Sequence, residues 1–300
     1  MLLEFSTSWF SHWSVGAVGL SLGSALLLLY TQAANLKGSD VIFWRGVGPV
    51  LALLPFLFFI PWPSSPTFYV ATITIGLIVS VFDRMILESA VMFGAGVTSR
   101  LLPLSTVGVF IIWLIIDSGE RASLFADPVR ASAIFACLAL STLSLALLKK
   151  CDVSKKALLF LLPTVAMAVA IDTLNKLAMD SMDVAFMHGM SVYIMIVSAF
   201  AGMGALVGRR LKRKKWDFAP LFTIKHYKAC GVITCIILGA MAAKGWGVIN
   251  TPNPAYVTSI GMSSSLWVLV IGRAAKLKDE GKVLAGLLFV ASAIALVLLS

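Results

Sequence analysis

The chain has little charge, few histidines and no paired cysteines, and each shortage excludes a class of protein. Charged residues make up 13% of its 300 residues, whereas 59% are hydrophobic and the mean hydropathy is +0.96. A water-soluble domain carries about twice that share of charged residues, so a soluble fold is excluded. The composition is that of a membrane protein.

The scarcity of histidine and cysteine argues against metal and catalytic sites. Cys137, Cys151, Cys230 and Cys235 show no paired spacing and have no accompanying histidine, so neither a disulfide framework nor a zinc site is indicated. With three histidines and no HExxH motif, the chain offers no recognisable catalytic set. We therefore expect no enzyme activity, no catalytic residues, no metal and no cofactor.

What the sequence does contain is continuous apolar runs. A spanning helix needs about 20 mostly apolar residues, at 1.5 Å each, to cross a hydrocarbon layer about 30 Å thick. Because the runs do not alternate between polar and apolar residues, helices are favoured over an outer-membrane barrel. The sequence predicts an all-α membrane protein of ten spans, at about 13–35, 39–61, 67–90, 95–117, 128–148, 156–177, 184–208, 227–248, 254–273 and 281–300.

A motif at the start of the second run recurs in the second half of the chain. Asp40–Gly46 reads DVIFWRG, and Asp183–Gly189 reads DVAFMHG, an offset of 143 residues with four identical positions. Val97-Thr98-Ser99 recurs as Val257-Thr258-Ser259 at an offset of 160. The basic stretch Arg209–Lys225 is long enough to account for the change of offset. The chain is therefore predicted to be a doubled unit.

Five spans per unit is an odd number, so the second unit should enter the membrane in the opposite sense from the first. Inverted repeats of this kind are the usual skeleton of secondary transporters, with a binding site between the halves. The sequence predicts two inverted five-helix repeats, residues 13–149 and 155–300.

The distribution of basic residues predicts the orientation. Only Arg121, Arg130 and Lys244 flank the even-numbered connections, whereas most of the 24 Lys and Arg residues lie in or beside the odd ones: Lys37, Lys149 to Lys156, Arg209 to Lys228, and Arg273 to Lys282. Because positive loops stay cytoplasmic, we expect a multi-pass protein of the plasma membrane, here a bacterial inner membrane, with both termini outside. Orientation accounts for the net charge of +10, so no nucleic-acid partner is expected. The Arg209–Lys225 run serves as a topology signal or also binds anionic membrane lipid.

Several of these motifs are similar to those of the drug/metabolite transporter superfamily, and within it of the EamA-type permeases. The resemblance is carried by Phe43-Trp44-Arg45 opening the second span, the Pro103 region of the fourth, Gly119-Glu120-Arg121 at its end, and Glu280 followed by Gly286. It covers nearly the whole chain and implies two inverted EamA-like repeats that transport or export small organic solutes. Several features depart from the family: His188 replaces Arg45 in the second repeat, the fifth span lacks the expected glycines, Glu280 lies in a basic connection, and family members are often drawn with cytoplasmic termini.

An ionisable residue inside a span costs at least about 2.5 to 3.5 kcal/mol, so each one suggests a function or a partner. Arg45 lies six residues inside the second span and has no acid at i±3 or i±4, so it needs a partner from another helix or from a ligand. The candidate substrate-binding or gate residues are Arg45, His188, Arg100, Gln32, Asn175, Trp44 and Ser263. For the two amides and Ser263, contacts between helices are an equal explanation.

Two acid and base pairs have the i, i+4 spacing that places both side chains on one helix face: Arg84 with Glu88, and Asp172 with Lys176. Glu88 and Asp172 are candidates for proton coupling, with plain ion pairing as the alternative. If both pairs form, Asp83 neutralises only one of Arg45 and Arg100. The other guanidinium then favours an amino acid or another carboxylate or zwitterion as substrate.

The sequence thus predicts a secondary transporter or exporter of small organic metabolites, working by alternating access between the two repeats. The alternative is a membrane-embedded lipid-headgroup carrier or partner subunit, which the basic loop after the seventh span favours.

Overall fold

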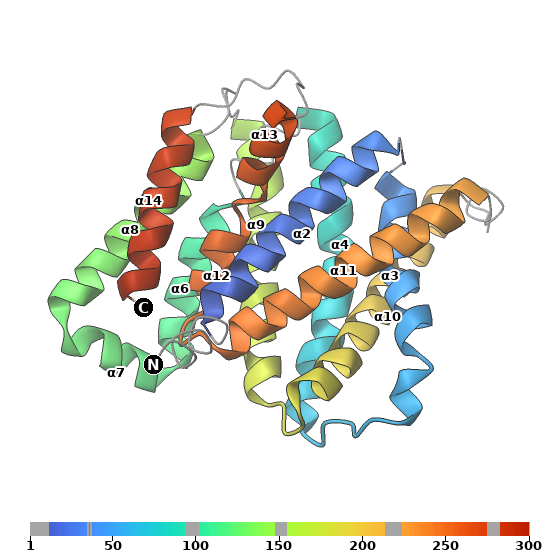
Figure 1. The fold of residues 1–300 in the computed structure, drawn as a ribbon, viewed down its shortest axis with the longest axis horizontal. Helices are drawn as coiled ribbons and strands as arrows, with labels where there is room; N and C mark the ends of the chain where they lie inside the picture. Colours follow the sequence, from blue (N-terminus) through green and yellow to red (C-terminus); the bar gives the residue numbers. More distant parts are fainter. Residues whose placement is uncertain are drawn as a thin grey trace.

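The computed structural model of the chain describes residues 12–34, 36, 38–93, 102–147, 155–213, 224–274 and 283–299. All regular elements within these ranges are helices, and none is a strand. The prediction of an all-α protein is therefore confirmed. Figure 1 shows the helices with the labels used below.

The described helices follow one another along the chain in two groups. The first half of the chain forms α2 (Trp13–Ala33), α3 (Gly38–Leu53), the 3₁₀ turn η1 (Phe56–Phe58), α4 (Pro66–Phe93), α6 (Leu104–Ile116), α7 (Ser118–Ala126) and α8 (Pro128–Leu147). The second half forms α9 (Lys155–Asp180), α10 (Phe186–Arg213), α11 (Ile224–Ile249), α12 (Pro254–Gly261), α13 (Ser264–Ala274) and α14 (Val283–Leu299).

Within the described ranges, six helices are long and apolar enough to cross a membrane. The spanning stretches are Trp13–Thr31, Pro66–Ile86, Pro128–Leu145, Lys155–Asp180, Phe186–Gly208 and Tyr227–Ile249. Two further helices, over Leu104–Ile116 and Leu284–Leu299, are apolar but shorter. The chain is thus a multi-pass membrane protein, as its composition indicates.

Prolines and a local turn shorten three of the predicted spans. The second predicted span ends early, because α3 stops at Leu53 and Pro55 caps the short turn that follows. Pro103 begins α6 instead of kinking a longer helix, as expected for a residue without a backbone N–H. The ninth predicted span is broken at Met262 and Ser263, between α12 and α13. The break is a 3₁₀-like turn in which Ser263 N donates to Ile260 O.

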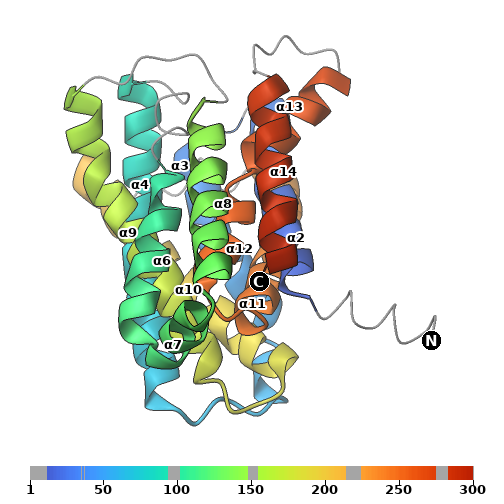
Figure 2. The ribbon, with the colours of Figure 1, turned by 90° about the vertical axis from the view of Figure 1, so that its left-hand side faces the viewer.

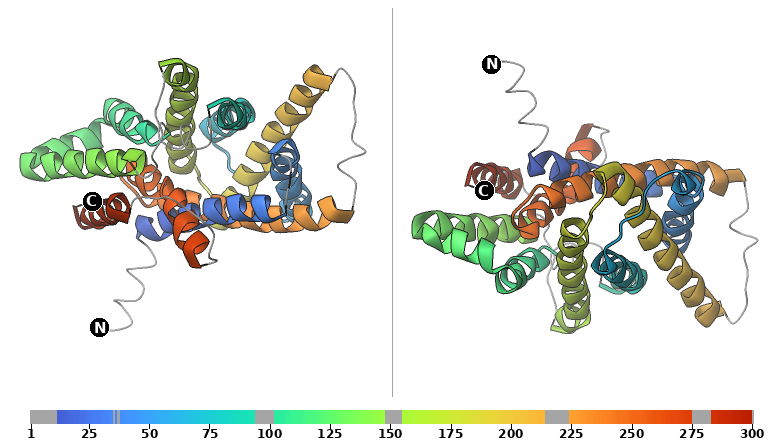
Figure 3. Two further views of the ribbon diagram at one scale, coloured as in Figure 1. Left: turned by 90° about the horizontal axis from the view of Figure 1, so that it is seen from above. Right: turned by 90° about the horizontal axis from the view of Figure 1, so that it is seen from below.

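The main helix contacts join the two halves of the chain. α2 crosses α11, α4 packs on α9, α3 packs on α10, and α8 packs on α14. In addition, α10 contacts α4, α11 contacts α3, α12 contacts α2 and α6 contacts α9. Figure 3 shows an elongated outline, with α7 and α8 near one end and α3 and α10 near the other. The start of α2 and the end of α14 lie toward the same end of the bundle (Figures 1 and 2).

Glycines allow two of these helix pairs to touch backbone to backbone. A Cβ on Gly16 of α2 would lie 2.4 Å from both Ala243 O and Gly247 N of α11. A Cβ on Gly46 of α3 would lie 2.4 Å from the Cα of Gly202 on α10. Small residues at such crossings let membrane helices gain van der Waals contact that lipid cannot supply. Gly46, the last residue of the repeated motif, is therefore required by packing.

We predict that Gly16→Ala destabilises the protein, because the new methyl group meets the α11 backbone. Overpacking of this kind costs about 1 to 3 kcal/mol, so the melting temperature in detergent should fall. The control is Gly239→Ala on α11, where a Cβ meets nothing within 4 Å and alanine improves helix propensity by up to about 1 kcal/mol. Equal melting temperatures for the two variants would contradict the close crossing of α2 and α11.

Candidate binding cavity

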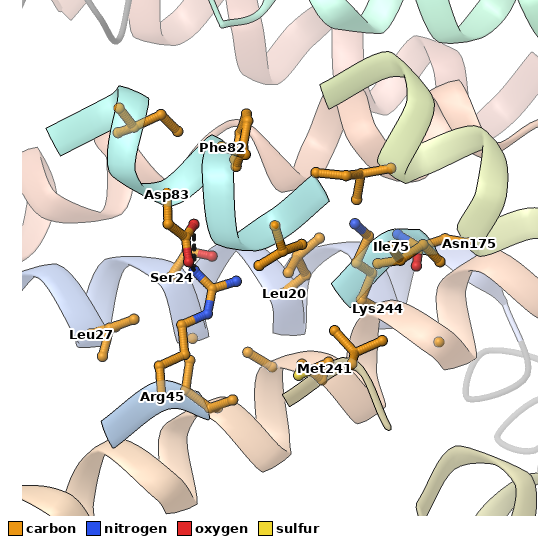
Figure 4. A pocket seen from close by; sticks show the side chains of 18 of the residues that line it. Leu20, Ser24, Leu27, Arg45, Ile75, Phe82, Asp83, Asn175, Met241 and Lys244 are labelled. Atoms are coloured by element: carbon orange, nitrogen blue, oxygen red, sulfur yellow. Dashed lines mark hydrogen bonds and ion pairs between the residues drawn. The ribbon is translucent and has the colours of Figure 1, made fainter. Parts of the chain in front are cut away.

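A cavity of about 450 Å³ lies between six helices, three from each half of the chain: α2, α3, α4, α9, α10 and α11. Its lining is mainly aliphatic and aromatic, with Leu20, Ile75, Phe82 and Met241 among the side chains that Figure 4 labels. A few polar side chains also reach it: Ser24, Thr31, Arg45, Asp83, Asn175, Tyr193 and Lys244. A volume and lining of this kind suit a small organic molecule with an apolar body.

Arg45 and Asp83 form an ion pair at one end of the cavity. The Nη1 group of Arg45, on α3, donates to both carboxylate oxygens of Asp83, on α4, at 2.9 Å each. The Asp83 side chain is 10% exposed and that of Arg45 36%, so the guanidinium is the more open partner. The sequence predicted that Arg45 needs a partner from another helix or a ligand, and Asp83 of α4 is that partner. Its Nε and Nη2 groups donate to no acceptor among the described residues.

A second ion pair lies toward the opposite end of the cavity. Lys244 Nζ, on α11, donates to Asp172 Oδ1 of α9 at 2.6 Å, and Thr258 Oγ1, on α12, donates to Asp172 Oδ2 at 2.8 Å. Lys244 lines the cavity and Asp172 does not, so the ammonium group stands between the carboxylate and the cavity. Figure 4 shows Lys244 beside Asn175, well separated from the Arg45 and Asp83 pair.

These contacts correct the predicted pairing of Asp172 with Lys176. Lys176 Nζ instead lies 2.7 Å from Asp180 Oδ1, one helical turn further along α9, and Asp172 takes its partner from α11. The spacing i, i+4 fits Lys176 to either acid, and only the tertiary structure selects Asp180. The other predicted pair is not testable, because the Glu88 side chain lies outside the described part of the chain.

Asn175 is the second predicted binding residue that reaches the cavity. Its Oδ1 accepts a hydrogen bond from the hydroxyl of Tyr193, on α10, and both residues line the cavity. The sequence left open whether this amide contacts another helix or the substrate. In the structure it joins α9 to α10 and also borders the cavity. The side chain of its repeat counterpart, Gln32, lies outside the described residues, as does the whole of Arg100.

The remaining candidates do not line the cavity. Trp44 is buried against Phe43 and Tyr227, with ring centroids 5.1 and 6.3 Å away. His188 is half-buried near the start of α10. Ser263 is buried, and its hydroxyl lies 2.7 Å from that of Ser21 on α2, so it takes part in helix packing.

Ser21 also needs comment, because Gly19-Leu20-Ser21-Leu22-Gly23 has the GxSxG spacing of hydrolase nucleophiles. In those enzymes the serine sits on a sharp turn between a strand and a helix, with its hydroxyl exposed. Here Ser21 is fully buried in the middle of α2 and its hydroxyl is bonded to Ser263. The motif therefore reflects the small-residue face of α2 that packs on α11 and the turn after α12.

Sequence reasoning missed Lys244, which it treated as a flanking residue of a connection. The residue lies five positions before the end of α11 and borders the cavity. One signal was present: at the offset of 160, Lys244 falls on Arg84, so both copies of this helix carry a base at that position. Thr258, which like Lys244 donates a hydrogen bond to Asp172, belongs to the repeated Val-Thr-Ser triplet.

Outside the spanning stretches, the second copy of the motif ties two connections together. The backbone N–H of Ser64 donates to Asp183 Oδ1 and Oδ2 at 3.0 and 3.2 Å, and its hydroxyl also donates to Oδ2. These hydrogen bonds hold the pKa of Asp183 below its usual value. The first copy of the motif differs at this position, because its aspartate, Asp40, is buried.

A second carboxyl group outside the spanning stretches is that of Glu120 on α7. Burial raises the pKa of Glu120, and the neighbouring Asp117 raises it further.

No model of a known protein family matches the chain, and a search of curated proteins finds no significant match. The site must therefore be interpreted from its own geometry.

We predict that Lys244→Met destabilises the protein by about 3 to 5 kcal/mol, because it leaves the Asp172 carboxylate buried without its cation. Adding Asp172→Asn should restore most of the loss, since the amide carries no charge. The control is Lys156→Met, which removes an exposed lysine at the start of α9. Thermal unfolding of the four purified proteins measures these effects. If the double variant is no more stable than Lys244→Met alone, the buried pair is not the cause.

Proposed function

We propose that the protein is a secondary transporter of small organic metabolites, with the cavity as its substrate site. The observation that carries the proposal is the position of this cavity, between three helices of the first half and three of the second. A site between two halves that rock against each other becomes accessible from each side in turn, which is the arrangement of alternating-access transporters.

The proposal includes the ten spans and the inverted repeat. In such a repeat α2, α3, α4, α6 and α8 correspond to α9, α10, α11, the broken helix α12 and α13, and α14. Exchanging each helix for its counterpart turns the contact of α2 with α11 into that of α9 with α4, and the contact of α4 with α10 into that of α11 with α3. It turns the contact of α2 with α12 into that of α9 with α6, and leaves the pairs α3 with α10 and α8 with α14 unchanged. This exchange supports a two-fold relation between the halves.

The same architecture is implied by the resemblance to EamA-type permeases, which remains part of the proposal. Of the residues that carry the resemblance, Trp44 and Arg45 lie on α3 next to the crossing glycine Gly46, and Arg45 borders the cavity. The motif therefore combines helix packing with a cavity charge.

The favoured substrate is a carboxylate or a zwitterion with an apolar body. The sequence argument left one of Arg45 and Arg100 without an acid: Asp83 neutralises Arg45, and Arg100 lies outside the described residues, so the preference rests on the cavity itself. At one end, the cavity offers the N–H groups of Arg45 that are not bonded to Asp83. At the other end it offers the ammonium group of Lys244, which is paired with Asp172. Guanidinium N–H groups bind carboxylates through charge-assisted hydrogen bonds.

A matched set of three compounds tests this preference: leucine, 4-methylpentanoate, which lacks the amino group, and 3-methylbutylamine, which lacks the carboxylate. We expect the purified protein in nanodiscs to bind the two carboxylates and not the amine, as measured by thermal shift. Arg45→Lys keeps the charge and loses the fork, so it should weaken carboxylate binding about tenfold or more. Preferential binding of the amine would contradict the anionic preference. Copurified anionic lipid in the cavity, with no binding of any of the three, would favour a lipid-headgroup carrier.

The charge distribution yields a separate prediction of topology. We expect both termini outside and the connection between α10 and α11 in the cytoplasm, since positive loops are retained there. Fusions of a cytoplasm-active and a periplasm-active reporter to Ser300 measure this. Activity of the cytoplasmic reporter alone would reverse the orientation and exchange the two ends of the cavity.

A further inference from the structure

We propose that Asp83 is an internal competitor of the substrate carboxylate for Arg45, so that each carboxylate bound by the cavity brings one proton to Asp83. The inference rests on the proposed function and adds that the coupling ion is a proton, which Asp83 carries. It also changes the candidate, because the sequence pointed to Glu88 or Asp172 for proton coupling.

The geometry distinguishes Asp83 from Asp172. Asp83 borders the cavity and is bound through a single nitrogen, Nη1 of Arg45, at 2.9 Å. Asp172 does not border the cavity, and its two oxygens are bound by two different groups, Lys244 and Thr258. A ligand can therefore reach the bond between Arg45 and Asp83, whereas Lys244 shields Asp172.

Charge balance then requires the proton. The pair of Arg45 and Asp83 is neutral, so an ionised carboxylate that joins it creates two carboxylates around one guanidinium in a mainly apolar cavity. Like charges that share a site cannot both stay ionised at low cost, and an unpaired buried carboxylate is expensive. A proton from water that adds to an Asp83 oxygen removes the excess charge, and Arg45 then pairs with the ligand. When the ligand leaves on the other side, Asp83 releases the proton and pairs with Arg45 again.

In the described part of the chain, no other charged residue is placed to replace Arg45 as the partner of both Asp83 and the ligand. Arg84 follows Asp83 on α4 but is exposed and has its own interactions, and the side chains of α9 and α10 that border the cavity are neutral. Besides Asp83 itself, the titratable and charged groups that border the cavity in the described part of the chain are Arg45 of α3, Tyr193 of α10 and Lys244 of α11, with Asp172 of α9 behind Lys244. Lys244 and Asp172 are already engaged with each other at the opposite end of the cavity.

The test measures the pH dependence of 4-methylpentanoate binding to the wild-type protein in nanodiscs, between pH 6.5 and 8.5, by calorimetry. If binding takes up one proton, the Kd rises by up to about tenfold per pH unit above the range where Asp83 is protonated in the free protein. Calorimetry in two buffers of different ionisation enthalpy counts the protons directly, and we expect a value near one. This measurement needs no variant and is independent of folding defects.

The matched variants are Asp83→Asn and Asp127→Asn. Asp83→Asn removes the competitor, so it should bind the carboxylate more tightly at pH 8.5, with no proton uptake and a flat pH profile. Asp127→Asn removes an exposed carboxylate at the start of α8 and keeps a good helix cap, so it should behave like the wild type. A pH effect that arises from any other group would persist in Asp83→Asn, so a flat profile there assigns the proton to Asp83.

Three results overturn the inference. Binding to the wild type without proton uptake contradicts proton coupling and leaves the transporter proposal standing. Weaker binding to Asp83→Asn shows that Asp83 helps to hold the ligand instead of competing with it. Failure of the wild type to bind any carboxylate at all removes the anionic substrate itself, and the inference with it.

Discussion

A charge inside a membrane must be neutralised by the protein, and in this chain that constraint determines how the helices around the cavity are joined. The two ion pairs beside the cavity each connect different helices: Arg45 of α3 with Asp83 of α4, and Lys244 of α11 with Asp172 of α9. The pairs lie at opposite ends of an otherwise apolar space. The same contacts that neutralise the buried charges therefore also place N–H donors at both ends of the cavity.

Close helix crossings supply the complementary constraint. Gly16 lets α2 touch α11, and Gly46 lets α3 touch α10, so the two halves of the chain meet through backbone contacts on the cavity helices. At Gly16 and Gly46 the contact is close van der Waals packing of one helix backbone on another. A bundle held together by small-residue crossings and a few ion pairs is well suited to two alternative packings.

The sequence predicted the helical architecture well and the side-chain partners poorly, and the reason is physical. Apolar runs indicate directly which segments are helical, so the all-α class is confirmed, but three of the predicted spans are shorter or broken in the structure. The breaks at Pro55 and Met262 depend on local turn geometry, and only the first of them has a proline as a signal. Partners of buried charges depend on which helices are neighbours. The i, i+4 rule therefore paired Lys176 with Asp172, whereas the structure gives Lys176 to Asp180 and Asp172 to Lys244.

The central claim, that the cavity is reached from both sides of the membrane in turn, can be measured through Ser24, which borders it on α2. In a variant without the four native cysteines, Ser24→Cys would be exposed to a membrane-impermeant thiol reagent from each face of sealed vesicles. We predict that the thiol reacts from either face and that 4-methylpentanoate slows both reactions. Reaction from one face only, under all conditions and without protection by the ligand, would contradict alternating access.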